Sequence, residues 1–209
     1  GHVVVQVPNR AFDDYPAVTN TARNVDGVLA ATPIVEGQAL ATSRAAAAGA
    51  VVRGVVPEDF VRDNLAGQQI VAGDMSLFHG KKAAVIGNRL ARSLQVRVGD
   101  EVKLIAPEGV STAFGTVPRS LTVQVVGLFN IGMYEYDSGF VFLPMEAAQL
   151  FYRTGDAVSG VEIMLQDPDD TEVAMRDIGQ ALGPGYRISD WRQAHGHLVT
   201  ALQVERNVM

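Results

Sequence analysis

The chain has 209 residues, of which 47% are hydrophobic and 19% are charged, and its net charge is −6 at pH 7. This composition is typical of a globular protein with one large domain or two small ones, and it excludes an intrinsically disordered chain. The acidic balance argues against a general nucleic-acid-binding protein. Because the chain has no cysteine, it can form neither disulfides nor cysteine-ligated metal sites.

The first third of the chain alternates between strand-like and helix-like hydrophobic patterns. Strand-like runs occur at residues 3–7, 28–42 and 50–56. The second of these runs is expected to break near Glu36 and Gly37. A helix is predicted within residues 13–25, with Asp14 as a possible cap, and a short helix follows Pro57. The order is therefore β-α-β-β, closed by the short helix.

The middle of the chain consists of short elements separated by glycines. Strands are expected at residues 83–86, 101–106, 121–126 and 138–143, and helices at 87–94 and 144–152. Short strands separated by turns are typical of a small β-rich subdomain with two helices.

The link between the strands at 101–106 and 121–126 is the most informative segment. It is far longer than the roughly two to five residues of an ordinary hairpin connection. It is bounded by Pro107 and Pro118, and it carries one large aromatic residue, Phe114. A compact domain rarely keeps so long a connection unless the connection binds something. The sequence therefore points to this link as the functional region.

The last part of the chain repeats the pattern of the beginning. A strand at 159–165 precedes a helix at 168–182, whose Val173, Ile178 and Leu182 are expected to face inward. A short strand at 186–188 and a helix at 191–207 follow. We therefore predict an α+β architecture in which both ends of the chain form one subdomain around an inserted β-rich one. Because the last helix runs to the end of the sequence without a stop signal, we expect the chain to be a piece of a longer protein.

Signals for catalysis or metal binding are few. His195 and His197 stand two residues apart on the predicted last helix and would point to different sides, so surface histidines are favoured over a metal site. The acidic cluster formed by Asp167, Asp169 and Asp170 is expected to cap a helix. No nucleophile, phosphate-loop or zinc motif occurs. The aromatic segment at residues 133–136 is compatible with an exposed binding surface, but packing of its aromatic side chains into the core is favoured. We predict a non-enzymatic domain with no catalytic residue, cofactor or metal.

Four runs of the chain have a recognisable order and spacing, at residues 84–91, 98–105, 123–129 and 140–151. Residues 34–39 and 201–209 fit the same pattern. Together these runs resemble the periplasmic domain of the lipoprotein-releasing permeases, the LolC/LolE family, over nearly the whole chain.

This resemblance implies a MacB-like periplasmic fold. A porter-like α+β subdomain would be made of residues 1–67 and 157–209, and an inserted β-rich subdomain, the Sabre, would cover residues 68–156. The resemblance also implies a bacterial inner-membrane ABC transporter whose permeases release lipoproteins to the periplasmic carrier LolA. In that family ATP is hydrolysed by a separate subunit, LolD, and two permease subunits act together.

In this family a protruding hairpin called the Hook captures LolA, and a polar pad lies beside it. By resemblance, the pad falls on Lys103 and Arg119. The Hook falls on Pro107, Glu108, Gly109, Val110, Ser111, Thr112, Ala113, Phe114, Gly115, Thr116, Val117 and Pro118.

The residues themselves favour the same mechanism. Prolines at both roots hold the link extended and lower the entropy that is lost on binding. Its apolar residues predict an exposed face that needs a partner, and Lys103 and Arg119 could pair with acidic groups of the carrier on the same side of the hairpin. Two alternatives stay open. One is a MacB-type or FtsX-type extracytoplasmic domain with another partner, and the other is a soluble enzyme.

Overall fold

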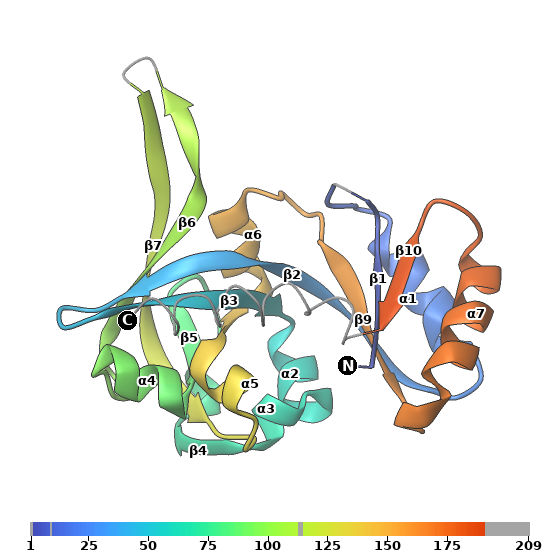
Figure 1. Ribbon diagram of the computed structural model, residues 1–209, viewed down its shortest axis with the longest axis horizontal. Helices are drawn as coiled ribbons and strands as arrows, with labels where there is room; N and C mark the ends of the chain where they lie inside the picture. The colour runs from blue at the N-terminus through green and yellow to red at the C-terminus, as the bar shows by residue number, and fades with distance from the viewer. Residues whose placement is uncertain (1, 9, 113–114, 191–209) are drawn as a thin grey trace, which may run out of the picture. The chain divides into compact units, whose positions relative to one another are not determined.

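The computed structural model describes residues 2–8, 10–112 and 115–190. The fold is mixed α+β, as the sequence predicts, and its elements follow one another along the chain as Figure 1 shows. None of the helices in these residues is long and apolar enough to cross a membrane. The predicted helix at 191–207 lies outside the described residues.

The chain forms two compact units. Unit 1 contains residues 1–34 and 156–209, and unit 2 contains residues 35–155. Residues 35–67 belong to unit 2, whereas the resemblance groups them with the two ends of the chain. The reason is that β3 (Ala47–Val55) pairs in parallel with β8 (Phe140–Pro144), and that Phe60 packs on Phe142 at 4.7 Å between ring centroids. These long-range contacts hold residues 35–67 in unit 2.

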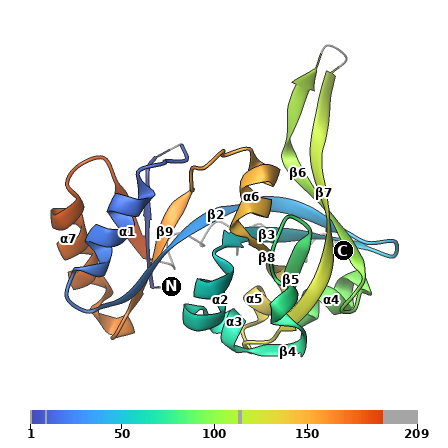
Figure 2. The same ribbon diagram turned by 180° about the vertical axis from the view of Figure 1, so that it is seen from behind.

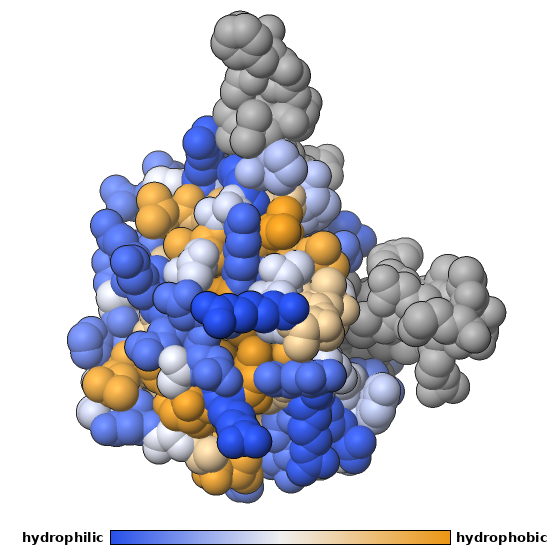
Figure 3. Space-filling model, turned by 90° about the vertical axis from the view of Figure 1, so that its left-hand side faces the viewer, coloured by the Kyte–Doolittle hydropathy of each residue, from blue (hydrophilic) through white to orange (hydrophobic). Residues whose placement is uncertain are grey.

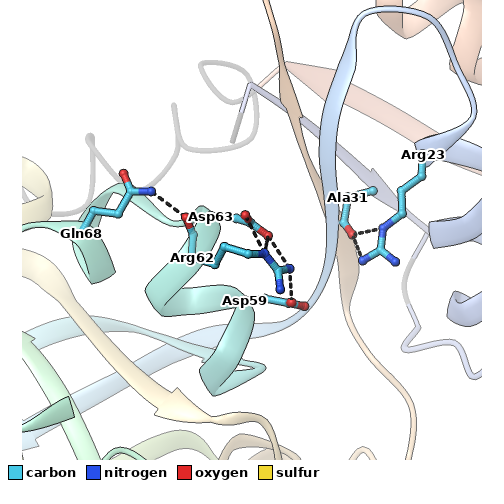
Figure 4. Close-up of polar contacts among 6 residues, drawn as sticks. All are labelled: Arg23, Ala31, Asp59, Arg62, Asp63 and Gln68. Carbon is cyan, nitrogen blue, oxygen red and sulfur yellow. Dashed lines mark hydrogen bonds and ion pairs between the residues drawn. The ribbon is translucent and has the colours of Figure 1, made fainter. Parts of the chain in front are cut away.

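Unit 1 is an antiparallel sheet with two helices. The strands lie in the order β10 (Arg187–Asp190), β1 (Val3–Gln6), β9 (Gly160–Leu165) and the first half of β2 (Val28–Thr42). Helix α1 (Tyr15–Arg23) packs on α7 (Thr171–Leu182) and on β9. Arg23 at the end of α1 donates two hydrogen bonds to the carbonyl of Ala31, at 3.1 and 2.8 Å (Figure 4), which joins the helix to β2.

Helix α7 faces the core differently from the prediction. Ile178 is buried as expected, but Val173 is 47% exposed, and Ala174 takes the inward position instead. Ala174 precedes Ile178 by one helical turn of four residues, whereas Val173 lies on the neighbouring face. Of the acidic residues before the helix, Asp167 caps as predicted, since its carboxylate accepts a hydrogen bond from the backbone N–H of Asp169 at 2.9 Å in the 3-10 turn η2 (Pro168–Asp170). Asp170 stands at the N-cap of α7, but its side chain makes no cap hydrogen bond.

The strands of unit 2 pair in a closed circuit. The second half of β2 pairs with β3, and β3 pairs with β8. Next come β5 (Ala83–Gly87), which pairs with β8, and β7 (Gly115–Phe129), which pairs with β5. Strand β6 (Glu101–Thr112) pairs with β7 and returns to β2, and β4 (Ile70–Gly73) extends the edge of β7. Such a closed circuit leaves few open edges.

Helices and an aromatic core complete unit 2. The helices are α2 (Pro57–Asp63), α3 (Leu65–Gln68), α4 (Asn88–Leu94), α5 (Tyr134–Gly139) and α6 (Met145–Tyr152), with the 3-10 turn η1 (Met75–Leu77). The largest fully buried aromatic side chains are those of Phe60, Phe78, Phe129 and Phe142. On the outside of α2, Arg62 donates to the carboxylates of Asp59 and Asp63, and its own carbonyl accepts from the Gln68 amide at 2.6 Å (Figure 4).

The aromatic segment at residues 133–136 begins helix α5 and packs in two ways. The ring of Tyr136 stacks on Phe140 at 4.3 Å between centroids, as inward packing predicts. Tyr134 is 57% exposed, and the guanidinium of Arg89 lies 5.3 Å from its ring centroid. Inward packing is therefore correct for Tyr136 and wrong for Tyr134.

Substitution of a core aromatic should strongly destabilise unit 2. Phe142 is 1% exposed and its ring contacts those of Phe60, Phe129 and Phe140. We expect Phe142→Ala to lower the free energy of unfolding by about 3–5 kcal/mol, because it leaves a cavity among rigid rings. Urea denaturation followed by circular dichroism measures this loss. Leu65→Ala, at a residue that is 49% exposed, is the control and should change stability by less than about 0.5 kcal/mol. An equal effect of the two substitutions would contradict this assignment of the core.

Candidate functional site: a projecting hairpin and its root

Residues 107–118 form a continuous hairpin. Strands β6 and β7 run through this segment, with Gly109 opposite Pro118, Val110 opposite Val117, and Thr112 opposite Gly115. The strands predicted at residues 101–106 and 121–126 leave this segment as a link between them, and that prediction is wrong for its backbone, which continues both strands. The β-branched residues on both sides of the tip were the signal for strands, since such residues favour extended backbone.

The hairpin projects away from the rest of unit 2 (Figures 1 and 2). Strand β6 pairs with β2 only from Lys103 to Ile105, which lie opposite Thr42 and Leu40. A shift of register on β6 between Ile105 and Gly109 separates this anchored part from the outer part. In the described residues beyond that shift, the two strands pair with each other alone. The outer hairpin is therefore held at its root, and among the described residues no further strand pairs with it.

Most side chains of the predicted Hook lie outside the described part of the structure, namely those of residues 108–117. Phe114 is among them, so its part in binding a partner remains a prediction. The two bounding prolines are described, and both Pro107 and Pro118 are exposed. Proline is tolerated here because a projecting two-stranded ribbon has no further strand that needs its missing N–H.

The two predicted pad residues lie on opposite faces of the ribbon. Lys103 is exposed and lies opposite Thr122, which places it on the face of Ser120. Arg119 precedes Ser120 and therefore points the other way. Its side chain is half-buried, and its Nη1 donates to the backbone carbonyl of Tyr152 at 2.9 Å. Lys103 and Arg119 therefore do not share one surface, contrary to the sequence-based expectation.

Arg119 lines a pocket of about 330 Å³ at the root of the hairpin. The other lining residues come from β2, β6 and the end of α6, and they are Glu36, Gly37, Gln38, Ala106, Pro107 and Tyr152. All of them belong to unit 2. The pocket is therefore built where the hairpin leaves the closed strand circuit.

Tyr152 joins α6 to β2 in this pocket. Its hydroxyl donates to the carbonyl of Gln38 at 3.1 Å, and its ring lies against Gly37, where an added Cβ would come within 2.6 Å of the ring carbons. The predicted break of the strand near Gly37 is wrong, because β2 runs without interruption from Val28 to Thr42. Glycine at this position makes room for the aromatic ring, which is a common reason for glycine inside a strand.

An ion pair between the buried Arg53 and the half-buried Glu36 supports the same part of β2. Arg53 is 1% exposed, and its Nε donates to the carboxylate of Glu36 at 2.7 Å while its guanidinium lies 5.4 Å from the centroid of Phe140. Burial, and to a lesser extent the carboxylate of Glu36, raises the pKa of the Tyr152 phenol, whereas Arg119 lowers it. Tyr152 therefore keeps its proton at neutral pH and remains a hydrogen-bond donor. Sequence patterns did not reveal this cluster, because its members are far apart in the chain.

The surface next to the hairpin carries both hydrophilic and hydrophobic residues. On the face that carries α4, hydrophilic residues separate smaller hydrophobic clusters (Figure 3). Among the described residues, no group of three or more His, Asp or Glu side chains could hold a metal ion. His195 and His197 lie outside the described residues. The hairpin and its root are thus the part of the described structure with the clearest functional geometry.

Comparison with known proteins identifies the family. Residues 1–181 match the model of the MacB-like periplasmic core domain. The chain belongs to this family. It is 31% identical over its whole length to the lipoprotein-releasing system transmembrane protein LolC of Xylella fastidiosa strain 9a5c, and 30% identical to LolC of Neisseria meningitidis. It covers 50% and 51% of those proteins, so it spans about half the length of its relatives.

Solved structures show the same fold. The extracellular domain of the ABC-type transporter YknZ from Gram-positive bacteria aligns with a TM-score of 0.56 and 14% identity, covering 90% of this chain and 98% of that one. The periplasmic region of MacB from Actinobacillus actinomycetemcomitans aligns with a TM-score of 0.54 and 11% identity, covering 94% and 91%. This chain is accordingly a MacB-like periplasmic core domain that is similar to part of LolC, and the MacB-like fold implied by the resemblance is confirmed.

Proposed function

We propose that this domain recruits the periplasmic carrier LolA through the hairpin at residues 107–118, so that a lipoprotein extracted from the membrane can be handed over. The observation that carries the proposal is the projection of the hairpin from unit 2, in a chain that aligns over its full length with LolC proteins. In this proposal the complete permease works with a second permease subunit and with the ATPase subunit LolD. The porter-like part would correspond to the ends of the chain, and the Sabre to the part that carries the hairpin.

The geometry of the hairpin suits capture of another protein. The outer strands leave their outward-facing backbone N–H and C=O groups accessible, and a hairpin of this kind can insert into a cleft or add to the edge of a sheet. A carrier that accepts an acyl chain must offer an apolar mouth, and the sequence of the hairpin segment includes the apolar residues Val110, Phe114 and Val117. Burial of such residues against the carrier would supply most of the affinity.

Direct binding tests the proposal. The domain should capture purified LolA in surface plasmon resonance, and excess free domain should compete for the carrier. The fold is also that of MacB, so the alternative is a MacB-type or FtsX-type domain that transmits ATP-driven motion to another periplasmic partner. Absence of binding to LolA by a folded domain would overturn the proposal in favour of this alternative.

Lys103 should influence the rate of encounter more than the affinity. It is exposed at the root of the hairpin, where it can attract acidic groups of the carrier. An exposed pair of this type contributes only about 0.2–1 kcal/mol and is screened by salt. We expect Lys103→Glu to lower the association rate constant at low salt and to flatten its salt dependence. Glu101→Gln, a change of an exposed residue on the same face of β6, is the control. An unchanged association rate at low salt would exclude Lys103 from the pad.

A further inference from the structure

We propose that Arg119 and Tyr152 are positioning residues that set the direction of the hairpin relative to the body of unit 2. The contacts concerned are the hydrogen bond from Arg119 to the Tyr152 carbonyl and the one from the Tyr152 hydroxyl to the Gln38 carbonyl, which we call the root contacts. They connect β7, α6 and β2. The consequence for carrier binding rests on the proposed function above, whereas the effect on hairpin direction does not.

The hairpin needs such contacts because its other attachment is short. Strand β6 pairs with β2 only over residues 103–105, and the register shift follows directly after them. A two-stranded ribbon on its own is only marginally stable and bends easily. Arg119 lies beyond the paired part, on the face of the ribbon that turns towards α6. Its contact adds a second point of attachment, so that the ribbon is held from two sides.

The groups that receive these contacts are themselves fixed. Tyr152 is the last residue of α6, and its ring fills the space over Gly37. The strand on which Gly37 lies is held by the ion pair between Glu36 and the buried Arg53. The Tyr152 carbonyl at the end of α6 and the Gln38 carbonyl on β2 are therefore fixed acceptors, and hydrogen bonds to them can define the direction of the hairpin. A guanidinium also has a planar donor geometry that restricts the angle of approach.

Orientation matters for capture because only hairpins that point in the competent direction can bind. If the root contacts are lost, the competent fraction falls, and the apparent dissociation constant rises in inverse proportion to that fraction. The association rate should fall with it, while the dissociation rate of the formed complex should change little. This pattern differs from the loss of a direct contact, which acts mainly on dissociation.

Distance measurements on the free domain test the inference. The chain contains no cysteine, so Ser111→Cys on the hairpin and Ser93→Cys on α4 allow two spin labels to be attached specifically. Double electron–electron resonance should give one narrow distance distribution for the otherwise unchanged domain. With Arg119→Gln we expect a clearly broader distribution, and with Tyr152→Phe a smaller broadening. Lys103→Gln, which removes a charge on the opposite face of the ribbon, is the matched control and should leave the distribution unchanged.

Binding to LolA supplies the second readout. Arg119→Gln should weaken binding about tenfold through a slower association, and the effect should persist at high salt because it arises from orientation. The effect of Lys103→Gln should disappear at high salt. Melting temperatures confirm that each variant is folded, and Tyr152→Phe provides a second test if Arg119→Gln does not fold.

An unchanged distance distribution in a folded Arg119→Gln domain would overturn the inference. A binding defect of this variant that vanishes at high salt would also overturn it, because Arg119 would then contact the carrier directly. If the unaltered domain does not bind LolA, the proposed function fails, and the inference is judged on the distance distributions alone.

Discussion

A domain whose hairpin is shortened should lose all measurable capture of LolA and keep its fold. The register pairs Val110 with Val117, so deleting residues 110–117 and joining Gly109 to Pro118 through an Asn-Gly turn preserves the pairing of the remaining strands. Among the described residues, those deleted pair only with each other and with no strand of the closed circuit. The melting temperature should therefore stay almost unchanged.

Surface plasmon resonance with LolA over the immobilised domain measures this effect. The matched control is a domain in which Ser43, Arg44, Ala45 and Ala46, the turn between β2 and β3, are replaced by an Asn-Gly turn, which shortens a different hairpin of unit 2. This control should bind normally. Retention of binding by the domain that lacks residues 110–117 would show that the carrier docks elsewhere.

The second large effect is expected from Phe114, the only large aromatic residue of the hairpin. Aromatic anchors at the centre of an interface typically cost at least about 2 kcal/mol when truncated, which corresponds to more than a tenfold loss of affinity. We expect Phe114→Ala to weaken binding of LolA at least about tenfold and to leave the melting temperature almost unchanged. Isothermal titration calorimetry and thermal denaturation together measure both quantities.

Two controls make the result for Phe114 specific. Phe114→Leu keeps an apolar side chain and should retain part of the affinity. Leu150→Ala removes a side chain that is 54% exposed on α6 and should leave binding unchanged. A clear drop of the melting temperature in Phe114→Ala would instead assign this residue to the core.

Local sequence patterns predicted much of the secondary structure. The bounds of β2 at Val28–Thr42 follow from alternating hydrophobic residues, and α4 follows from Leu90 and Leu94 at helical spacing. Both periods depend on the geometry of a single element, so they can be read from one stretch of chain. The resemblance to lipoprotein-releasing permeases likewise depended on the order and spacing of short runs.

The sequence patterns failed where the local structure of a residue depends on a contact with a residue far along the chain. Gly37 looked like a break in a strand, but it is the place where the ring of Tyr152 lies against β2. The segment at 107–118 contains two prolines and two glycines, which are typical of an irregular link, but β-branched residues lie between them. Strand pairing across the tip outweighs those local preferences.

The sequence by itself determined that this protein is an α+β domain, and its resemblance to LolC-like permeases led to the proposal that residues 107–118, which Lys103 and Arg119 flank, are the functional segment. Only the tertiary structure decided that residues 35–67 belong with the hairpin-bearing unit, and that Arg119 turns inward to Tyr152 while Lys103 stays exposed. The physical reason is that side-chain direction on a ribbon and membership of a core depend on strand register and on partners far along the chain. Neither leaves a periodic signal in the sequence.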